Sequence, residues 1–241
     1  MELKPIRTDN QAVGRGATYE PAQEAVDVAQ GQKVLRNTYL LLAATMVPTV
    51  IGAAIGIQTS GVIVEHPIIS FFVMLGAVIG LQFGIAANRN SGVGVALLLL
   101  MTGLLGWFLG PLLNYALTMR NGMQLVGYAA VGTGAIFFGM GVLAQTIKRD
   151  LTFMGKFLFV GMIALLIAMV ANMFLQIPAL ALTISTLVVV VFSLFLLYDL
   201  NRIVRGGETN YVMATTGVYI SLLNIFSSLL HLLLALGGEK D

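Results

Sequence analysis

The polar side chains whose spacing could support chemistry lie near the C-terminus, in a mostly apolar segment between residues 211 and 236. Their separations of four, three, four and three residues place them on one face of an α-helix. The set comprises Gly217, Ser221, Asn224, Ser228 and His231. Hydroxyl, amide and imidazole groups are costly in hydrocarbon unless they find partners, so we expect this face to be buried among other helices. Of its two possible roles, we favour a packing seam over the lining of a functional site.

A second candidate group stands just before this segment, where one acid and two bases lie close together. Asp199, Arg202 and Arg205 fall at the end of the preceding apolar segment. An anion there faces the negative end of the helix dipole, so it needs compensation. Arg202 is three residues on and can pair with Asp199 on the same face. We therefore favour an interfacial ion pair, and an inner-gate carboxylate is the functional alternative.

The sequence lacks the motifs of enzymes and of cofactor-binding proteins. It has no cysteine, no H-E-x-x-H zinc motif and no G-x-S-x-G nucleophile elbow. Glu65, His66 and His231 are predicted near one membrane face, but two loosely placed histidines are weak support for a metal site. No acid or base lies well inside any apolar segment, which argues against a proton pump or an ion-coupled transporter. We predict no catalytic residues, no metal and no cofactor.

The elements that position these groups are predicted to be membrane-spanning helices. Of 241 residues, 58% are hydrophobic and only 10% are charged, too little polar material to cover a soluble globule. Apolar runs of about 20 residues are long enough to cross a bilayer. We place seven of them at residues 38–58, 67–87, 93–114, 124–146, 154–176, 178–200 and 211–236. The predicted fold is an all-α polytopic membrane protein.

The distribution of basic residues predicts the orientation of the chain. Residues 1–32 are polar and mixed in charge, so we expect a flexible tail before a transmembrane domain at residues 33–241. With the tail inside, eleven of the 13 basic residues lie on inner segments, and the other two are Arg120 and Lys240. This asymmetry predicts a cytoplasmic N-terminus and, after seven spans, an outer C-terminus. It also accounts for the net charge of +2 without a nucleic-acid partner.

Two features predict how the spans pack. The segment LQIPAL, residues 175–180, is so short that the fifth and sixth spans must form a tight antiparallel hairpin. Glycines let helix backbones approach closely, so their density in the third and fourth spans predicts close contacts there. They are Gly103, Gly106 and Gly110 in the third span, and Gly127, Gly132, Gly134, Gly139 and Gly141 in the fourth.

Several strings that hydropathy does not dictate resemble the Bax inhibitor-1 (TMBIM) family of seven-helix membrane proteins. Two of them are LYDLNRIV at the end of the sixth span and VYISLLNIF in the seventh. KVLRNTY, LGPLLN, DLTFMGKFL, MVANMFLQIPALALTIS and GGETNYVMATTGVYISLLNIFSSLL are similar to the bacterial branch that modulates the FtsH protease. The longest string opens with a family-matching loop formed by Gly206, Gly207, Glu208, Thr209, Asn210 and Tyr211.

The resemblance implies a fold in which six helices surround a central seventh, in the bacterial inner membrane with a periplasmic C-terminus. It implies a non-enzymatic protein that binds the AAA+ protease FtsH, restrains its degradation of membrane substrates and is itself a candidate substrate. The membrane regulators of FtsH are further candidate partners. Calcium-leak members of the family carry a second aspartate where this chain has Ser221. A pH-sensitive calcium or cation leak is therefore the alternative function, and calcium is a partner only in that case.

Overall fold

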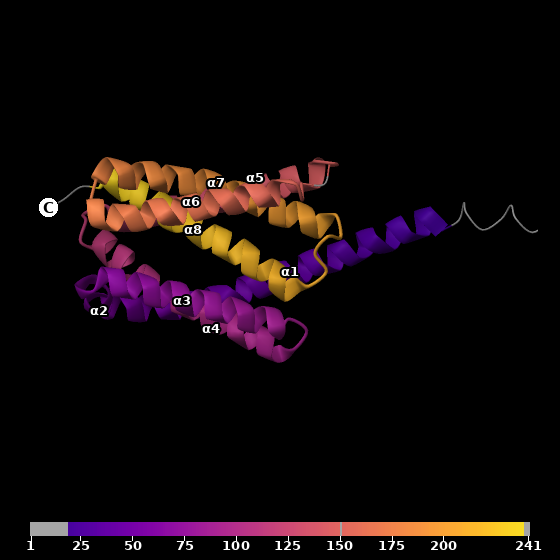
Figure 1. Cartoon of the computed structure of the whole chain (residues 1–241), viewed down its shortest axis with the longest axis horizontal. Coiled ribbons are helices and arrows are strands. Elements are labelled where there is room, and N and C mark those ends of the chain that lie inside the picture. The colour runs from indigo at the N-terminus through magenta and orange to yellow at the C-terminus, as the bar shows by residue number, and fades with distance from the viewer. Residues whose placement is uncertain (1–18, 150, 239–241) are drawn as a thin grey trace, which may run out of the picture.

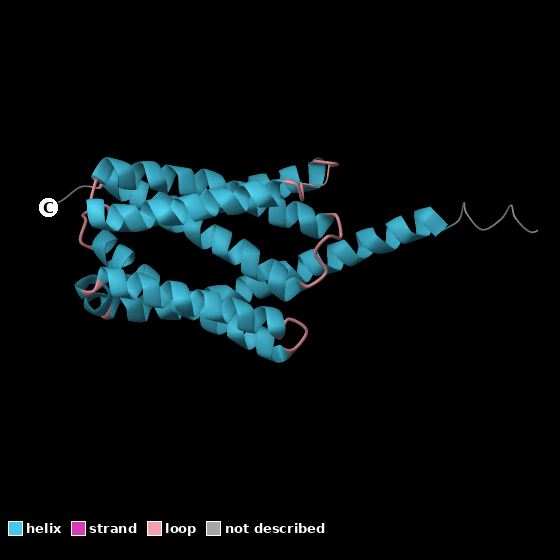
Figure 2. Ribbon diagram, in the orientation of Figure 1, coloured by secondary structure: helices cyan, strands magenta, loops and turns pink. Residues whose placement is uncertain are grey.

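The computed structural model describes residues 19–149 and 151–238, with the backbone alone for residues 19–30. All its regular elements are helices (Figure 2). They are α1 (Tyr19–Gln58), α2 (Ser60–Glu65), α3 (Pro67–Ala87), α4 (Gly92–Leu117), α5 (Gly122–Thr146), α6 (Met154–Leu175), α7 (Pro178–Val204) and α8 (Tyr211–Gly237). Seven of them are long and apolar enough to cross a membrane, which confirms the predicted number of spans.

The first helix differs from the sequence prediction. Its membrane-spanning part begins at Gly31, but the helix itself begins at Tyr19 and extends beyond the bundle (Figure 1). Residues 19–32, expected to belong to a flexible tail, are therefore helical. The segment is rich in Ala, Gln and Glu, which favour helix, and it continues a helix that is already nucleated in the bundle. Residues 1–18, the rest of the expected tail, lie outside the described residues.

The long helices form two groups with α8 running diagonally between them (Figure 1). In one group α4 packs against α1 and α3, and in the other α7 packs against α5 and α6. α8 contacts α7 and α5 on one side and α1 and α4 on the other. α6 and α7 are joined through Gln176 and Ile177 alone, and they pack together as the predicted hairpin.

Proline and glycine mark the ends of several helices. Proline stands at the start of α3 and α7, where its missing N–H costs nothing. α7 ends at Val204, and two residues later Gly206 has a φ of +73°, which is favourable for glycine. The Gly207 and Gly206 amides donate to the carbonyls of Arg202 and Ile203, which is the Schellman pattern. The chain then turns back, and α8 begins.

The glycine prediction is confirmed for α4 and wrong for much of α5. Gly106 and Gly110 lie so close to α1 that an added Cβ would overlap the backbone of Thr49 or Gly56. In α5, by contrast, Gly127 and Gly139 have no atom within 4 Å of such a Cβ. A Cβ added to Gly134 or Gly141 would likewise meet no atom within 4 Å, and that of Gly132 would meet only the tip of Leu229. Glycine density alone does not reveal which face of a helix meets a neighbour.

The short helix α2 was not predicted. It lies between α1 and α3 and is tied to α4, since the Asn114 amide nitrogen donates to Ser60 Oγ at 2.9 Å. Trp107 Nε1 donates to Thr59 Oγ1 at 2.7 Å, just before α2. Six residues are too few to give a hydropathy signal of their own, so the sequence predicts only a connection between two spans here.

Candidate functional site

The polar face predicted from the sequence lies on α8, and we call it the polar stripe. It comprises Gly217, Ser221, Asn224, Ser228 and His231. It lies against α7 at both of its ends. Near the N-terminal end, a Cβ on Gly217 would lie 2.7 Å from a carboxylate oxygen of Asp199. Near the C-terminal end, His231 Nδ1 and Ser185 Oγ of α7 are 2.8 Å apart. Between them Ser221 is buried, with 2% of its surface exposed. The stripe therefore contributes to the seam between α7 and α8.

Other polar side chains of α8 bond to the backbone of their own helix. The stripe residue Asn224 donates to the carbonyl of Ile220 at 2.8 Å. Thr216 and Ser227 bond the carbonyls four residues before them in the same way. Such bonds satisfy a polar group inside an apolar bundle without another helix or water.

The expected ion pair between Asp199 and Arg202 is not formed. Arg202 pairs instead with Glu208, at 3.2 Å between Nη2 and Oε2, and its Nε donates to the carbonyl of Gly207. The Schellman turn brings Glu208 back towards Arg202, which spacing along α7 alone does not reveal. The Asp199 carboxylate forms no ion pair or hydrogen bond with the described part of the chain. Gly217 leaves the space that this carboxylate fills.

The family-matching loop positions the start of α8. The Asn210 side chain caps the helix, because its Oδ1 accepts from the amides of Val212 and Met213. Its Nδ2 donates to the carbonyl of Arg89 at 2.9 Å and to Oδ1 of Asn90 at 2.8 Å. One side chain thus joins the α7–α8 loop to the α3–α4 loop. Gly206, Gly207 and Glu208 shape the loop as described above, whereas Thr209 and Tyr211 are exposed.

Asn201 and Arg205 hold the turn between α5 and α6. Asn201 is fully buried, and its Oδ1 accepts from the amide of Leu151 at 3.2 Å. Its Nδ2 donates to the carbonyls of Ala144 and Ile147. Arg205 also donates to Ile147, at 2.7 Å. Arg205 therefore binds a backbone carbonyl rather than forming the ion pair that its place near Asp199 suggested.

Sequence reasoning also missed Tyr219, which is 1% exposed. Its hydroxyl lies 2.8 Å from Oγ1 of Thr49 in α1 and donates to the carbonyl of Thr102 in α4 at 3.2 Å. These contacts tie α8 to the group opposite α7. The available signal was a tyrosine in the middle of an apolar span, because a buried hydroxyl needs a partner.

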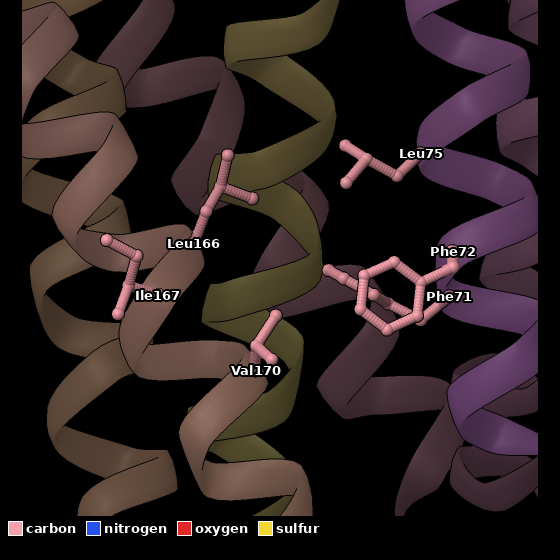
Figure 3. Close-up of a pocket in the computed structure, with 6 residues that line it drawn as sticks. All are labelled: Phe71, Phe72, Leu75, Leu166, Ile167 and Val170. Atoms are coloured by element: carbon pink, nitrogen blue, oxygen red, sulfur yellow. The ribbon is translucent and has the colours of Figure 1, made fainter.

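An apolar crevice of about 220 Å³ opens between α3 and α6. Phe71, Phe72 and Leu75 extend from α3, and Leu166, Ile167 and Val170 from α6 (Figure 3). None of these side chains can bind an ion or transfer a proton. Among the described residues, no three metal-ligating side chains come together. His66 and His231 are likewise not gathered into a metal site in that part of the chain.

Comparison with known proteins agrees with this architecture. Residues 31–238 match the family described as inhibitor of apoptosis-promoting Bax1. An uncharacterized protein of Neisseria meningitidis is 41% identical over 209 residues, 86% of this chain and 92% of its own length. The modulator of FtsH protease YccA of Escherichia coli K12 is 39% identical over 201 residues, 83% of this chain and 89% of its own length. An uncharacterized membrane protein of Vibrio cholerae is 40% identical over 205 residues, 83% of this chain and 88% of its own length.

The family match covers every membrane-spanning helix, and the relatives extend over nearly the same length. The family is one of modulators rather than enzymes. A protein of Escherichia coli with 39% identity also carries the name inner membrane protein YccA. The resemblance drawn from the sequence strings is thus confirmed, and this seven-span membrane protein belongs to the Bax inhibitor-1 family.

Proposed function

We propose that this protein binds the FtsH protease in the bacterial inner membrane and restrains its degradation of membrane substrates. The observation that carries the proposal is the 39% identity, over 83% of the chain, to a relative named modulator of FtsH protease. Membrane regulators of FtsH are further candidate partners. The contacts of α8 with α1, α4, α5 and α7 support the proposed arrangement of six helices around a central seventh.

The orientation is part of the proposal. With the N-terminus in the cytoplasm, the N-terminal extension of α1 projects from the cytoplasmic end (Figure 1). The α3–α4, α5–α6 and α7–α8 loops lie at that same end, and the C-terminus is periplasmic. The asymmetric distribution of basic residues supports this orientation. A partner with a cytoplasmic ATPase would then meet ordered helix and loop surfaces here.

Co-purification tests the proposed partner. The affinity-tagged full chain is extracted in mild detergent, and the associated proteins are identified by mass spectrometry. We expect enrichment of FtsH over a control in which an unrelated membrane protein carries the same tag. In proteoliposomes that contain FtsH and a membrane substrate, added protein should slow degradation of that substrate. Absence of both enrichment and slowing would reject the proposal.

The protein is also a proposed substrate of the protease. An AAA+ motor must first grip an accessible segment, and the N-terminal region is the longest stretch outside the spans. Deletion of residues 3–29 should lengthen the half-life of the protein in cells that contain FtsH and leave it unchanged in cells that lack FtsH. An equal half-life for the truncated and full-length chains would show that the handle lies in a loop instead.

A cation leak is the alternative function, favoured by the Asp199 carboxylate between α7 and α8, which has no ion pair or hydrogen bond with the described residues. The residue that would supply the second acid is Ser221, so a carboxylate pair is not available. We expect little calcium flux through the purified protein in liposomes, and no new flux after Asp199→Asn. Ser221→Asp should introduce a pH-dependent leak if the family geometry is shared. A pH-gated flux in the native protein, abolished by Asp199→Asn, would make the leak the leading function.

A further inference from the structure

The turn between α5 and α6, the first turn of α6 and the adjacent end of α7 carry a group of exposed cations. We name this group the cationic corner, and it comprises Lys148, Arg149, Lys156 and Arg205. No member forms an ion pair with the described residues, whereas Arg202 at the same end of the bundle is paired with Glu208. Asp150 lies outside the described residues. Four cations and this one acid still leave a charge of +3.

Hydrogen bonds from α7 fix the backbone that carries the cationic corner. The buried Asn201 side chain bonds the backbone on both sides of Lys148 and Arg149, at Ile147 and Leu151. Arg205 is drawn to the same turn by its 2.7 Å bond to the Ile147 carbonyl. A Cβ added to Gly155 would lie 3.0 Å from the Tyr198 hydroxyl, so the first turn of α6 lies directly against α7. The cations are therefore borne by a fixed backbone rather than by an unattached loop.

Exposed aromatic side chains accompany these cations. Phe153 precedes α6 and is 64% exposed, and Phe157 in the first turns of α6 is 77% exposed. They bracket Lys156, which lies at the start of a membrane-spanning helix. Aromatic side chains favour the boundary between headgroups and acyl chains, and lysine side chains extend towards the headgroups. The corner therefore combines charges at headgroup level with apolar anchors beside them.

We propose that the cationic corner binds the phosphate groups of anionic phospholipids in the adjacent leaflet. Charge complementarity supports this occupant, because clustered lysines and arginines next to a span attract anionic lipids. Lys156 adds a second reason, since a cation in the first turn of a helix faces the positive end of its dipole. A bound phosphate would offset that repulsion. An acidic peptide would supply negative charge alone, whereas a phospholipid also carries the acyl chains that suit Phe153 and Phe157.

Topology alone does not explain this arrangement. A bias of basic residues towards one side of the membrane is satisfied wherever they lie along that side. Lys33, Arg36 and Arg89 are also exposed at this end, but they belong to α1 and to the α3–α4 loop. They provide a matched control, since their removal changes the net charge of the same end by the same amount.

Native mass spectrometry of the full chain in detergent tests the proposal, with phosphatidylglycerol and phosphatidylcholine of identical acyl chains as probes. We expect phosphatidylglycerol to bind more tightly. Each basic residue near anionic lipid contributes about 1 kcal/mol, or about fivefold in affinity. Three such contributions would reach about a hundredfold if they were fully additive, so the triple substitution K148Q/R149Q/K156Q should weaken phosphatidylglycerol binding by at least about tenfold. The control K33Q/R36Q/R89Q should change it by less than about twofold, and raised salt should weaken binding to the native protein.

Three results would overturn the proposal. The corner variant would retain its preference for phosphatidylglycerol, or the control would lose as much as the corner variant. Alternatively, inorganic phosphate at millimolar concentration would displace the lipid, which would indicate a site for free phosphate.

Size-exclusion profiles establish that each variant is folded, and K148R/K156R should retain native affinity. If the triple variant does not fold, Lys156→Gln alone should still give a loss of about fivefold. The outcome is independent of FtsH binding.

Discussion

The contact between α1 and α4 gives the sharpest prediction for stability, because backbone meets backbone there. A Cβ added to Gly56 in α1 would overlap the carbonyl oxygen of Trp107 and lie 3.0 Å from the Cα of Gly110 in α4. These atoms cannot rotate away as the end of a side chain can. Substitution Gly56→Ala must therefore push the two helices apart.

Two opposing effects determine how much stability the Gly56→Ala variant loses. Overpacking costs about 1–3 kcal/mol, and we expect the upper end because backbone must move. Alanine returns about 1 kcal/mol through its better helix propensity. The expected net loss is about 2 kcal/mol, which corresponds to roughly 4–8 °C in melting temperature for a chain of this size. Gly127→Ala in α5 is the matched control, since its Cβ meets no atom within 4 Å and only the favourable effect remains.

Thermal unfolding in detergent measures the difference. Trp107 is the only tryptophan of the chain and lies in this contact, so its fluorescence follows the separation of α1 and α4. Size-exclusion chromatography after heating gives a second, independent midpoint. Gly56→Ala should melt several degrees below the native protein, and Gly127→Ala at or slightly above it. Equal midpoints for the two variants would refute the close approach of these helices.

Three further predictions concern hydrogen bonds and topology. Tyr219→Phe should lower stability by about 1–2 kcal/mol, through loss of the bonds to α1 and α4, whereas Tyr128→Phe on the exposed face of α5 should be neutral; equal melting points for both would contradict this. Asn201→Leu should cost about 1–3 kcal/mol and speed tryptic cleavage of the α5–α6 turn, and an unchanged cleavage rate would contradict its role. A reporter fused after Asp241 should report the outer compartment, and one inserted at Arg89 the cytoplasm; signals from the same side would mean a miscounted span.

The sequence predicts the spans well because hydropathy is a local property. Apart from the start of the first span, each predicted boundary lies within four residues of the helix end in the structure. Contacts between distant segments are different. Tyr219 bonds Thr49, 170 positions away, and no local pattern marks that partner. The prediction that Arg202 pairs with Asp199 was wrong for a related reason. The conformation of the turn after α7 brings Glu208 to Arg202, and the sequence does not reveal that conformation.

The role of the polar stripe of α8 depends on hydrogen bonds that its sequence spacing does not reveal. Spacing predicts that Ser221, Asn224 and His231 share one face, but a packing seam and a conduit require the same spacing. The bonds separate the two. Asn224 donates to a carbonyl of its own helix and His231 Nδ1 bonds Ser185 of α7, so each already has a protein partner. This favours a seam along most of α8. The exception is Asp199 beside Gly217, which forms no ion pair or hydrogen bond with the described residues, so the proposed alternative of a cation leak has to be tested at this carboxylate.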